Sequence, residues 1–242
     1  KNAFKDCTSL ESIRIPASVF SIGSGPLRGC TSLKCVEVDP KSRSFKSVGN
    51  ILFNKNKSII VAYPASSREV QYDIPDSVTV IGNYAFSECT SLSGINIPAG
   101  VTVIGEGTFY KCQSLTETVI PEGVTSIGDY AFHYCSGLKY IALPSTLKSI
   151  DKNAFYHCDT ITNITIPEGV ISIGERAFGF CDELESITLP STLESLGKEA
   201  FFRCESLPEV DLPDSLISIG SAAFSGCYNM NKLDIPNNVT SP

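Results

Sequence analysis

Residues 75–98 read PDSVTVIGNYAFSECTSLSGINIP, and this stretch decides the fold because its pattern recurs along the chain. The pattern is I-P-x-x-V-x-x-I-G-x-x-A-F-x-x-C-x-x-L-x-x-I-x-I-P, with a period of 23 residues. The Ile-Pro or Leu-Pro pair places proline at 16, 75, 98, 121, 144, 167, 190, 213 and 236. Seven complete units fill residues 75–235, another spans 16–38, and partial units stand at both ends. A regular internal period of this length indicates a stacked repeat architecture.

Each part of the unit predicts a local structure. The ending L-x-x-I-x-I alternates with a period of two, which predicts a short strand with Ile95 and Ile97 on the same side. Proline then ends strand pairing, since it lacks an N–H and fixes φ. The glycine after Ile81 is expected to provide a backbone geometry that a Cβ would oppose. The A-F-x-x-C stretch predicts a tight 3₁₀ or short helical turn that points Phe and Cys inward. Because one unit cannot enclose a core, the units must stack, with a rise of about 4.8 Å per coil.

The composition excludes several classes of protein. The chain has 242 residues and a formal net charge of −7, which is opposite in sign to that of a generic nucleic-acid binder. Hydrophobic residues make up 42% and charged residues 19%, which excludes wholesale disorder. The longest apolar run covers only residues 59–63. A membrane span needs roughly 18 such residues, so we expect no direct insertion of this chain into a membrane.

The repeat resembles the leucine-rich repeat of the BspA-like surface proteins. Two units carry the pattern at Ile81-Gly82, Ala85-Phe86, Cys89, Leu92, Ile95 and Ile97, and at Ile173-Gly174, Ala177-Phe178, Cys181, Leu184, Ile187 and Leu189. The resemblance implies an α/β-type leucine-rich-repeat solenoid shaped like a horseshoe. It further implies mostly short parallel strands, one per repeat, joined by 3₁₀ or short helical turns. The chain departs from the pattern where Pro26-Leu27 replaces Ala-Phe, Asp151 replaces Gly and Thr118 replaces the strand Ile.

The period breaks at residues 39–74, a segment 13 residues longer than one unit. Within it, residues 50–53 and 58–63 are apolar and flank the turn-rich quartet Asn54-Lys55-Asn56-Lys57, which predicts a β-hairpin. BspA-like proteins have a similar irregular unit, so we interpret 39–74 as an enlarged repeat that carries a protruding hairpin. Residues 1–242 are then a single solenoid. Since neither end carries a visible cap, we expect the chain to be a fragment of a longer protein.

Nine of the ten cysteines occupy one position of the repeat, which predicts a row of small buried thiols, one per coil. They are Cys7, Cys30, Cys89, Cys112, Cys135, Cys158, Cys181, Cys204 and Cys227. Parallel stacking points neighbouring Cβ vectors the same way, so we expect no disulfides. A metal needs several convergent ligands, whereas this row places one cysteine on each coil, so we expect no metal. Cys35 lies outside the row, and we expect it to be a free, exposed thiol.

The two histidines, His133 and His157, lie in neighbouring units beside a cysteine of the row. No nucleophile elbow, zinc-protease or P-loop motif accompanies them, and Gly23-Ser24-Gly25 is too short for a dinucleotide fingerprint. Acidic residues are scattered around each unit, with no motif that pairs two carboxylates for glycan hydrolysis. We therefore expect no catalytic site and no cofactor.

Two surfaces are candidates for binding. The two positions between Phe and Cys carry an aromatic row, and the strand positions that alternate outward carry varied side chains. The row consists of Tyr110, His133, Tyr134, Tyr156, His157, Phe180 and Phe202. It is open to two interpretations: packing between stacked turns, or a partly exposed strip for protein or glycan contact. The strand positions with the strongest candidates are Tyr140, Asn163, Thr165, Thr188, Glu209, Asp211 and Asp234. We expect these to line the concave face of a horseshoe, a face that curved solenoids use for binding, although a merely solvated surface is the alternative.

The resemblance implies a function for the module. BspA-like repeats occur in surface proteins implicated in adhesion to host matrix proteins, such as fibronectin and fibrinogen, and in attachment to host cells. We therefore expect a non-catalytic protein- or glycan-binding module of a bacterial cell-surface or secreted protein. The alternative is a structural spacer that displays another domain or assembles through its open ends. The sequence does not predict the oligomeric state.

Charge is distributed unevenly along the chain. Residues 1–74 contain eleven basic and six acidic side chains, whereas residues 75–242 contain eight and twenty. The regular repeats are therefore strongly acidic, and the irregular segment with Lys41, Arg43, Lys46, Lys55 and Lys57 is basic. We expect this polarity to influence which partners approach which end.

Overall fold

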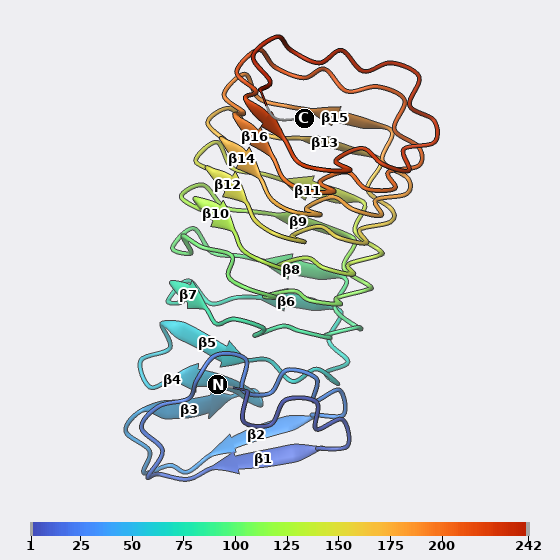
Figure 1. The fold of residues 1–242 in the computed structure, drawn as a ribbon. Coiled ribbons are helices and arrows are strands. Elements are labelled where there is room, and N and C mark those ends of the chain that lie inside the picture. The colour runs from blue at the N-terminus through green and yellow to red at the C-terminus, as the bar shows by residue number, and fades with distance from the viewer. Residues whose placement is uncertain (1, 241–242) are drawn as a thin grey trace.

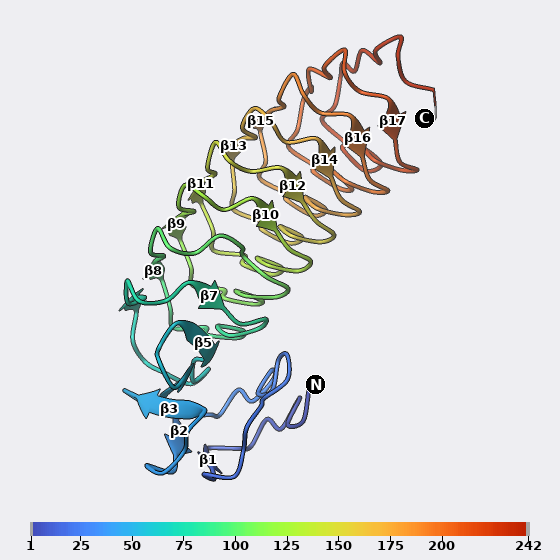
Figure 2. The same ribbon diagram turned by 90° about the vertical axis from the view of Figure 1, so that its left-hand side faces the viewer.

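The chain forms an elongated stack of coils along a gently curved axis (Figures 1 and 2). The computed structural model describes residues 2–240, which form 17 strands and no helix, so no helix within these residues has the length to cross a membrane. Short parallel strands form two interrupted ladders along the stack, on neighbouring sides of the coils (Figure 1).

The first ladder is built from the predicted L-x-x-I-x-I strands. It consists of β1 (Ser12–Ile15), β2 (Cys35–Val38), β6 (Gln71–Asp73), β8 (Gly94–Asn96), β9 (Glu117–Val119), β11 (Tyr140–Ala142), β13 (Asn163–Thr165) and β15 (Ser186–Thr188). Equivalent residues of successive units face each other, as in the pairs Ile13↔Val36 and Ile164↔Ile187. The central residue of each strand points into the core. The predicted strand and its direction are thus confirmed.

A second ladder makes the prediction of one strand per repeat wrong. It consists of β7 (Val80–Ile81), β10 (Ser126–Ile127), β12 (Ser149–Ile150), β14 (Ser172–Ile173), β16 (Ser195–Leu196) and β17 (Ser218–Ile219). Each of these strands ends at the isoleucine or leucine of the I-G pair, and the N–H of the next residue donates to a carbonyl of the preceding coil. That residue is glycine except after β12, where it is Asp151. The bond from Gly174 to Ile150 O, for example, is 2.8 Å long. The short V-x-x-I stretch is therefore extended and paired, although it is too short to show a strand period.

The tight turn predicted for A-F-x-x-C is present, but it is not helical, because alternate amides of this segment have different partners. The N–H groups of Ala85, Ser87 and Cys89 donate to carbonyls three residues earlier. The N–H groups between them donate instead to the next coil, as in the 3.0 Å bond from Phe86 N to Thr108 O. A helix requires consecutive internal bonds, whereas here every second amide stabilises the stack.

Rows of identical side chains fill the core. The phenylalanines of successive units stack with ring centroids 5.2–5.6 Å apart from Phe86 to Phe224. Most of these rings are fully buried, and Tyr63 continues the row toward the N-terminus at 5.0 Å. The rings and the aliphatic residues of the pattern form one continuous hydrophobic cluster from Ile51 to Cys227. Stacking of this kind makes each unit depend on its neighbours for its core.

The irregular segment forms a three-stranded antiparallel sheet of β3 (Phe45–Val48), β4 (Ile51–Asn54) and β5 (Ile59–Ala62). Strand β5 then pairs in parallel with β7 and so joins the second ladder. Gly49 and Asn50 connect β3 to β4 with φ of 56° and 66°, the two positive values that a type I′ hairpin turn requires.

This sheet does not protrude, contrary to the expectation, because both of its faces are covered. Leu52 and Ala62 pack into the hydrophobic cluster of residues 15–62, which includes the first two units. Phe53 and Ile60 pack into the cluster of the regular repeats. The apolar residues of the strands alternate between two cores, so the segment lies between the N-terminal units and the regular array (Figure 2).

Candidate binding surfaces

The cysteine row is a set of reduced, hydrogen-bonded thiols. Eight cysteines are buried, and all ten are free. From Cys112 to Cys227, each Sγ lies 3.0–3.3 Å from the carbonyl oxygen of the phenylalanine 26 residues earlier, to which the thiol donates. Cys7 is exposed, because the described chain has no coil on that side of it. Cys35 is only partly exposed, and its Sγ lies 3.2 Å from Asn50 Oδ1.

The two histidines are parts of the aromatic row. His133 is 8% exposed, and its ring stacks between Tyr110 and Tyr156 with centroid distances of 5.1 and 5.0 Å. Burial, followed by the neighbouring His157, lowers the pKa of His133 to about 4. His157 Nδ1 lies 3.0 Å from Asp159 Oδ1. Within residues 2–240, no cluster of three His, Cys, Asp or Glu side chains is arranged to hold a metal ion.

The aromatic row is assembled as the repeat predicts, but its members lie against one another. Tyr110, Tyr134, Tyr156 and Phe180 are half-buried. Rings of successive coils stack, as in the pairs Tyr134–His157 at 4.4 Å and His157–Phe180 at 4.5 Å. Cationic side chains cover parts of the row: the Cζ atom of Arg28 lies 4.9 Å from the ring centroid of Tyr110, and that of Arg203 lies 5.4 Å from the ring centroid of Phe180. The geometry therefore matches packing between stacked turns, with only the ring edges left for a partner.

The outward positions of the first ladder are open to solvent. The residues predicted for this face, Tyr140, Asn163, Thr165, Thr188, Glu209, Asp211 and Asp234, are all exposed. They form two rows across the strands, since Glu117 pairs with Tyr140, Asn163 with Ser186 and Thr165 with Thr188. The structure thus brings the strand residues together on one rigid face, which we call the strand face.

The strand face is hollowed around β8 to β11. A shallow hollow of about 290 Å³ is lined by Gln71, Gly94, Ile95, Asn96, Glu117, Thr118, Val119 and Tyr140. Val119 is 62% and Tyr140 54% exposed, which are high values for large apolar side chains. Thr118 forms part of the floor and is buried, with no hydrogen-bond partner for its hydroxyl. The sequence names Tyr140 as a candidate, but it does not predict the hollow, which Gly94 lines together with Gln71.

The C-terminal part of the strand face is acidic. Glu209 pairs with Lys232 in a β-bridge, and Lys232 Nζ lies 3.1 Å from Asp234 Oδ2. The carboxylate of Asp234 raises the pKa of Lys232. Asp211 lies in the same group of side chains and has no ion-pair partner among the described residues. One lysine therefore compensates part of the charge of three carboxylates.

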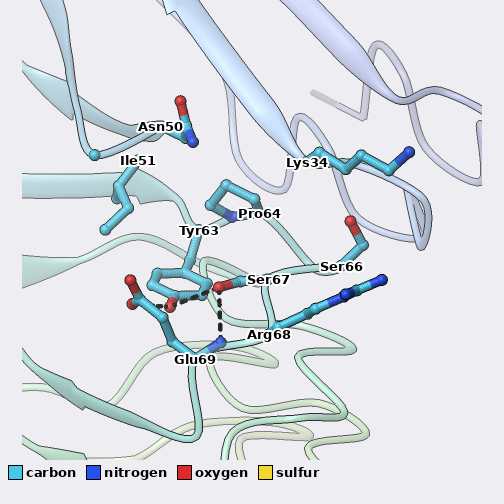
Figure 3. A pocket seen from close by; sticks show the side chains of 10 residues that line it. Lys34, Asn50, Ile51, Tyr63, Pro64, Ser66, Ser67, Arg68 and Glu69 are labelled. Carbon is cyan, nitrogen blue, oxygen red and sulfur yellow. Dashed lines mark hydrogen bonds between the residues drawn. The ribbon is translucent and has the colours of Figure 1, made fainter.

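A second pocket, of about 430 Å³, lies where the irregular segment interrupts the first ladder (Figure 3). Lys34 and Arg68 extend toward the same side of it. At its inner wall, Tyr63 donates a 2.8 Å hydrogen bond to Glu69 Oε2, and its hydroxyl lies 3.2 Å from Ser67 Oγ. The sequence does not predict this pocket, because most of its residues come from a segment outside the regular repeat.

The comparisons with known proteins agree with this geometry. The model of the BspA type leucine rich repeat region matches in six copies, over residues 1–71, 66–181 and 148–241. A leucine-rich repeat protein from Eubacterium ventriosum is 32% identical with a TM-score of 0.87, and the match covers 95% of this chain and 63% of that one. The T. pallidum leucine rich repeat protein is 27% identical with a TM-score of 0.61, over 76% of this chain and 77% of the other.

A third solved structure shares the fold at lower identity. The pneumococcal vaccine antigen PcpA is 24% identical with a TM-score of 0.52, over 96% of this chain and 50% of that one. This chain therefore spans less than two thirds of the length of PcpA and of the Eubacterium ventriosum protein. No curated protein matches it. Since the family model matches along almost the whole sequence and the structure has the corresponding repeat, the chain belongs to the BspA-type leucine-rich repeat family.

Proposed function

We propose that this chain is a non-catalytic binding region of a bacterial cell-surface or secreted protein, which attaches to a protein or glycan of a host matrix or host cell. The observation that carries this proposal is the strand face. Its side chains are varied and exposed, while the parallel ladder beneath them holds their positions. Curved solenoids commonly bind partners on such extended faces.

The family relationship supports the proposed location and class of partner. The resemblance to the BspA-like surface proteins implies a surface location, and one structural relative is described as a pneumococcal vaccine antigen. The family model that matches describes a leucine rich repeat region, a type of fold that commonly serves as a binding scaffold, which supports a non-catalytic role. The acidic charge of residues 75–242 favours partners with basic surfaces over nucleic acid.

A structural spacer is the second candidate. The observation that favours it is the aromatic row, in which each ring packs against the ring of the next coil. Together with the amides that bond from coil to coil, these contacts suit a rod that holds another domain away from a surface. A spacer of this kind needs no binding face.

Binding to immobilised fibronectin, fibrinogen and a glycan array tests the proposal. We expect micromolar or tighter binding to at least one of these probes. For a protein probe, the triple variant Glu209→Lys, Asp211→Lys and Asp234→Lys should bind about tenfold more weakly at low salt, because it reverses the charge of the acidic end of the strand face.

The matched control is a second triple lysine variant, which changes the net charge by the same amount at positions outside the strand face. Asp76, Glu194 and Asp214 are exposed and lie outside the first ladder, so their replacement by lysine should leave binding nearly unchanged. Equal affinities of the two triple variants would contradict a role for the acidic end of the strand face. Absence of binding to every probe at micromolar concentration would favour the spacer.

A further inference from the structure

We infer that the hollow around Tyr140 on the strand face is a binding site for a neutral sugar unit of a polysaccharide. This inference rests on the proposed binding function and specifies its ligand class. The site combines an exposed aromatic ring, free amide and carboxylate groups, and a cavity of small-ligand size.

The strand register places these groups side by side. Gln71 faces Gly94, Gly94 faces Glu117 and Glu117 faces Tyr140, so the four lie in one row across β6, β8, β9 and β11. Neighbouring strands lie about 4.8 Å apart, and the row is therefore continuous. A Cβ on Gly94 would stand 2.3 Å from Gln71 Oε1, so the amide of Gln71 lies directly over this glycine.

The polar groups at this site are available for a ligand. Within residues 2–240, the side chains of Gln71, Asn96 and Glu117 take part in no hydrogen bond or ion pair with the protein. Carboxylates elsewhere in the array are used to join coils: Glu106 accepts from Tyr84, Glu122 from Ser145 and Glu168 from Ser191. Amides and carboxylates can donate to or accept from the hydroxyls of a sugar.

Tyr140 differs from the tyrosines of the aromatic row in its surroundings. Rings such as Tyr110, Tyr134 and Tyr156 each contact further aromatic rings, whereas Tyr140 contacts none among the described residues. Val119 lies on the next strand beside it. A ring with an open apolar surface and a polar tip can pack against the C–H groups of a pyranose while polar neighbours bind its hydroxyls.

Size and charge favour a neutral sugar over other ligands. The volume of about 290 Å³ is at the lower end of the range of small-ligand pockets. Of the described residues, Val119 and Tyr140 are the only large exposed apolar side chains that line the hollow, so the hollow by itself supplies little of the roughly 800 Å² that each partner buries in a standard protein interface. No Lys or Arg lines the hollow, and Glu117 would repel an acidic polysaccharide.

Affinity electrophoresis of the whole chain tests the inference. The probes are the neutral polysaccharides pullulan, arabinoxylan and galactomannan, with heparin and polygalacturonate as acidic counterparts. We expect at least one neutral polysaccharide, and neither acidic one, to retard the chain. Tyr140→Ala should weaken this retardation about tenfold, while Tyr140→Phe should retain most of it because the ring remains.

Tyr228→Ala is the matched control, since Tyr228 is 71% exposed but lies outside the strand face. Its retardation should equal that of the unmodified chain. The inference is overturned if no neutral polysaccharide retards the chain, or if Tyr140→Ala is retarded as strongly as Tyr228→Ala. Should the chain bind fibronectin or fibrinogen while no polysaccharide retards it, the proposed binding function stands and the sugar site alone fails.

Discussion

The cysteine of each repeat combines small size, an apolar surface and a weak hydrogen-bond donor. Valine could not donate to the phenylalanine carbonyl of the preceding coil, and serine would bring a more polar group into a continuous apolar core. Burial raises the pKa of Cys89, Cys158 and Cys181 well above that of an ordinary thiol, which keeps them protonated donors. The predicted row of buried, reduced thiols is confirmed for eight of its nine cysteines, and Cys7 is the exception.

Thiol accessibility follows directly from this arrangement. In the folded chain, Cys7 should react rapidly with a thiol-specific reagent such as Ellman's reagent, Cys35 more slowly, and the eight buried thiols only after unfolding in denaturant. The measurement is the number of fast-reacting equivalents at neutral pH. The double variant with Cys7→Ser and Cys35→Ser should have no fast-reacting thiol. Any fast-reacting thiol in this variant would contradict the burial of the row.

His133 predicts a pH dependence of stability. Its pKa is about 4 in the folded chain against 6.5 for an ordinary histidine, so the unfolded chain binds the proton more tightly between these values. Neutral, buried His133 therefore contributes to the free energy of unfolding above about pH 6.5. This contribution, about 3 kcal/mol, is lost as the pH falls toward 4.

The comparison of the wild type with His133→Phe isolates this effect in urea unfolding at several pH values. Phenylalanine keeps an aromatic ring between Tyr110 and Tyr156 but has no titrating group. All carboxylates titrate in both proteins, so their contributions cancel in the difference. Parallel curves of unfolding free energy against pH would show that His133 titrates normally.

Backbone conformation at single residues was beyond sequence reasoning. Tyr134, His157 and Phe180 all have φ of 58°, in the left-handed region where residues with a Cβ are uncommon. They are the third residues of turns, a position that favours glycine when φ is positive. Nothing in an aromatic side chain indicates this conformation. It is imposed by the coil-to-coil hydrogen bonds on either side.

At the scale of the elements, the structure explains why glycine recurs after the isoleucine or leucine that ends each strand of the second ladder. We call this pair of residues the I-G step. The glycines at this step do not have positive φ. At most of these positions the backbone of the neighbouring coil packs against the glycine: a Cβ on Gly197 would stand 2.5 Å from Glu175 N and from Gly174 C. Asp151 is the exception that carries a side chain at this position. Close approach of backbones, and not turn geometry, accounts for this part of the pattern.

Gly197→Ala should therefore destabilise the chain by about 3 kcal/mol, because the backbone of the adjacent coil must shift. Gly100→Ala is the control, since its Cβ would meet Val78 O at 3.4 Å, close to ordinary contact. The measurement is the urea midpoint of each variant by circular dichroism. Equal midpoints for the two variants would contradict the close contact at the I-G step.

The first ladder was predictable and the second was not, for a physical reason. Ile95 and Ile97 show the alternation that identifies a strand, whereas the strands of the second ladder contain only two residues each. A two-residue strand has no period, and its pairing depends on the stack that it helps to form. The three-stranded sheet between the two cores was likewise missed in part, because burial on both faces leaves no polar alternation in residues 51–53.

At the scale of the whole molecule, the 23-residue period was sufficient to predict a solenoid and the set of residues on its strand face. It was not sufficient to place the hollow at Tyr140 or the pocket beside Arg68. Both depend on local departures from the repeat, a glycine at position 94 and an irregular segment before β6. Sites on a repeat scaffold arise where the repeat varies, and a consensus pattern does not describe that variation.

The central claim is that this chain binds its partner through the strand face and not through the aromatic row. The chain has no tryptophan, so Tyr140→Trp and Tyr134→Trp each introduce a single fluorescent reporter, one on each surface. Each variant is titrated with the matrix protein or polysaccharide that the unmodified chain binds. We predict that the emission shifts or is quenched at position 140 and is unchanged at position 134. A change at 134 alone, or at neither position, would contradict the account.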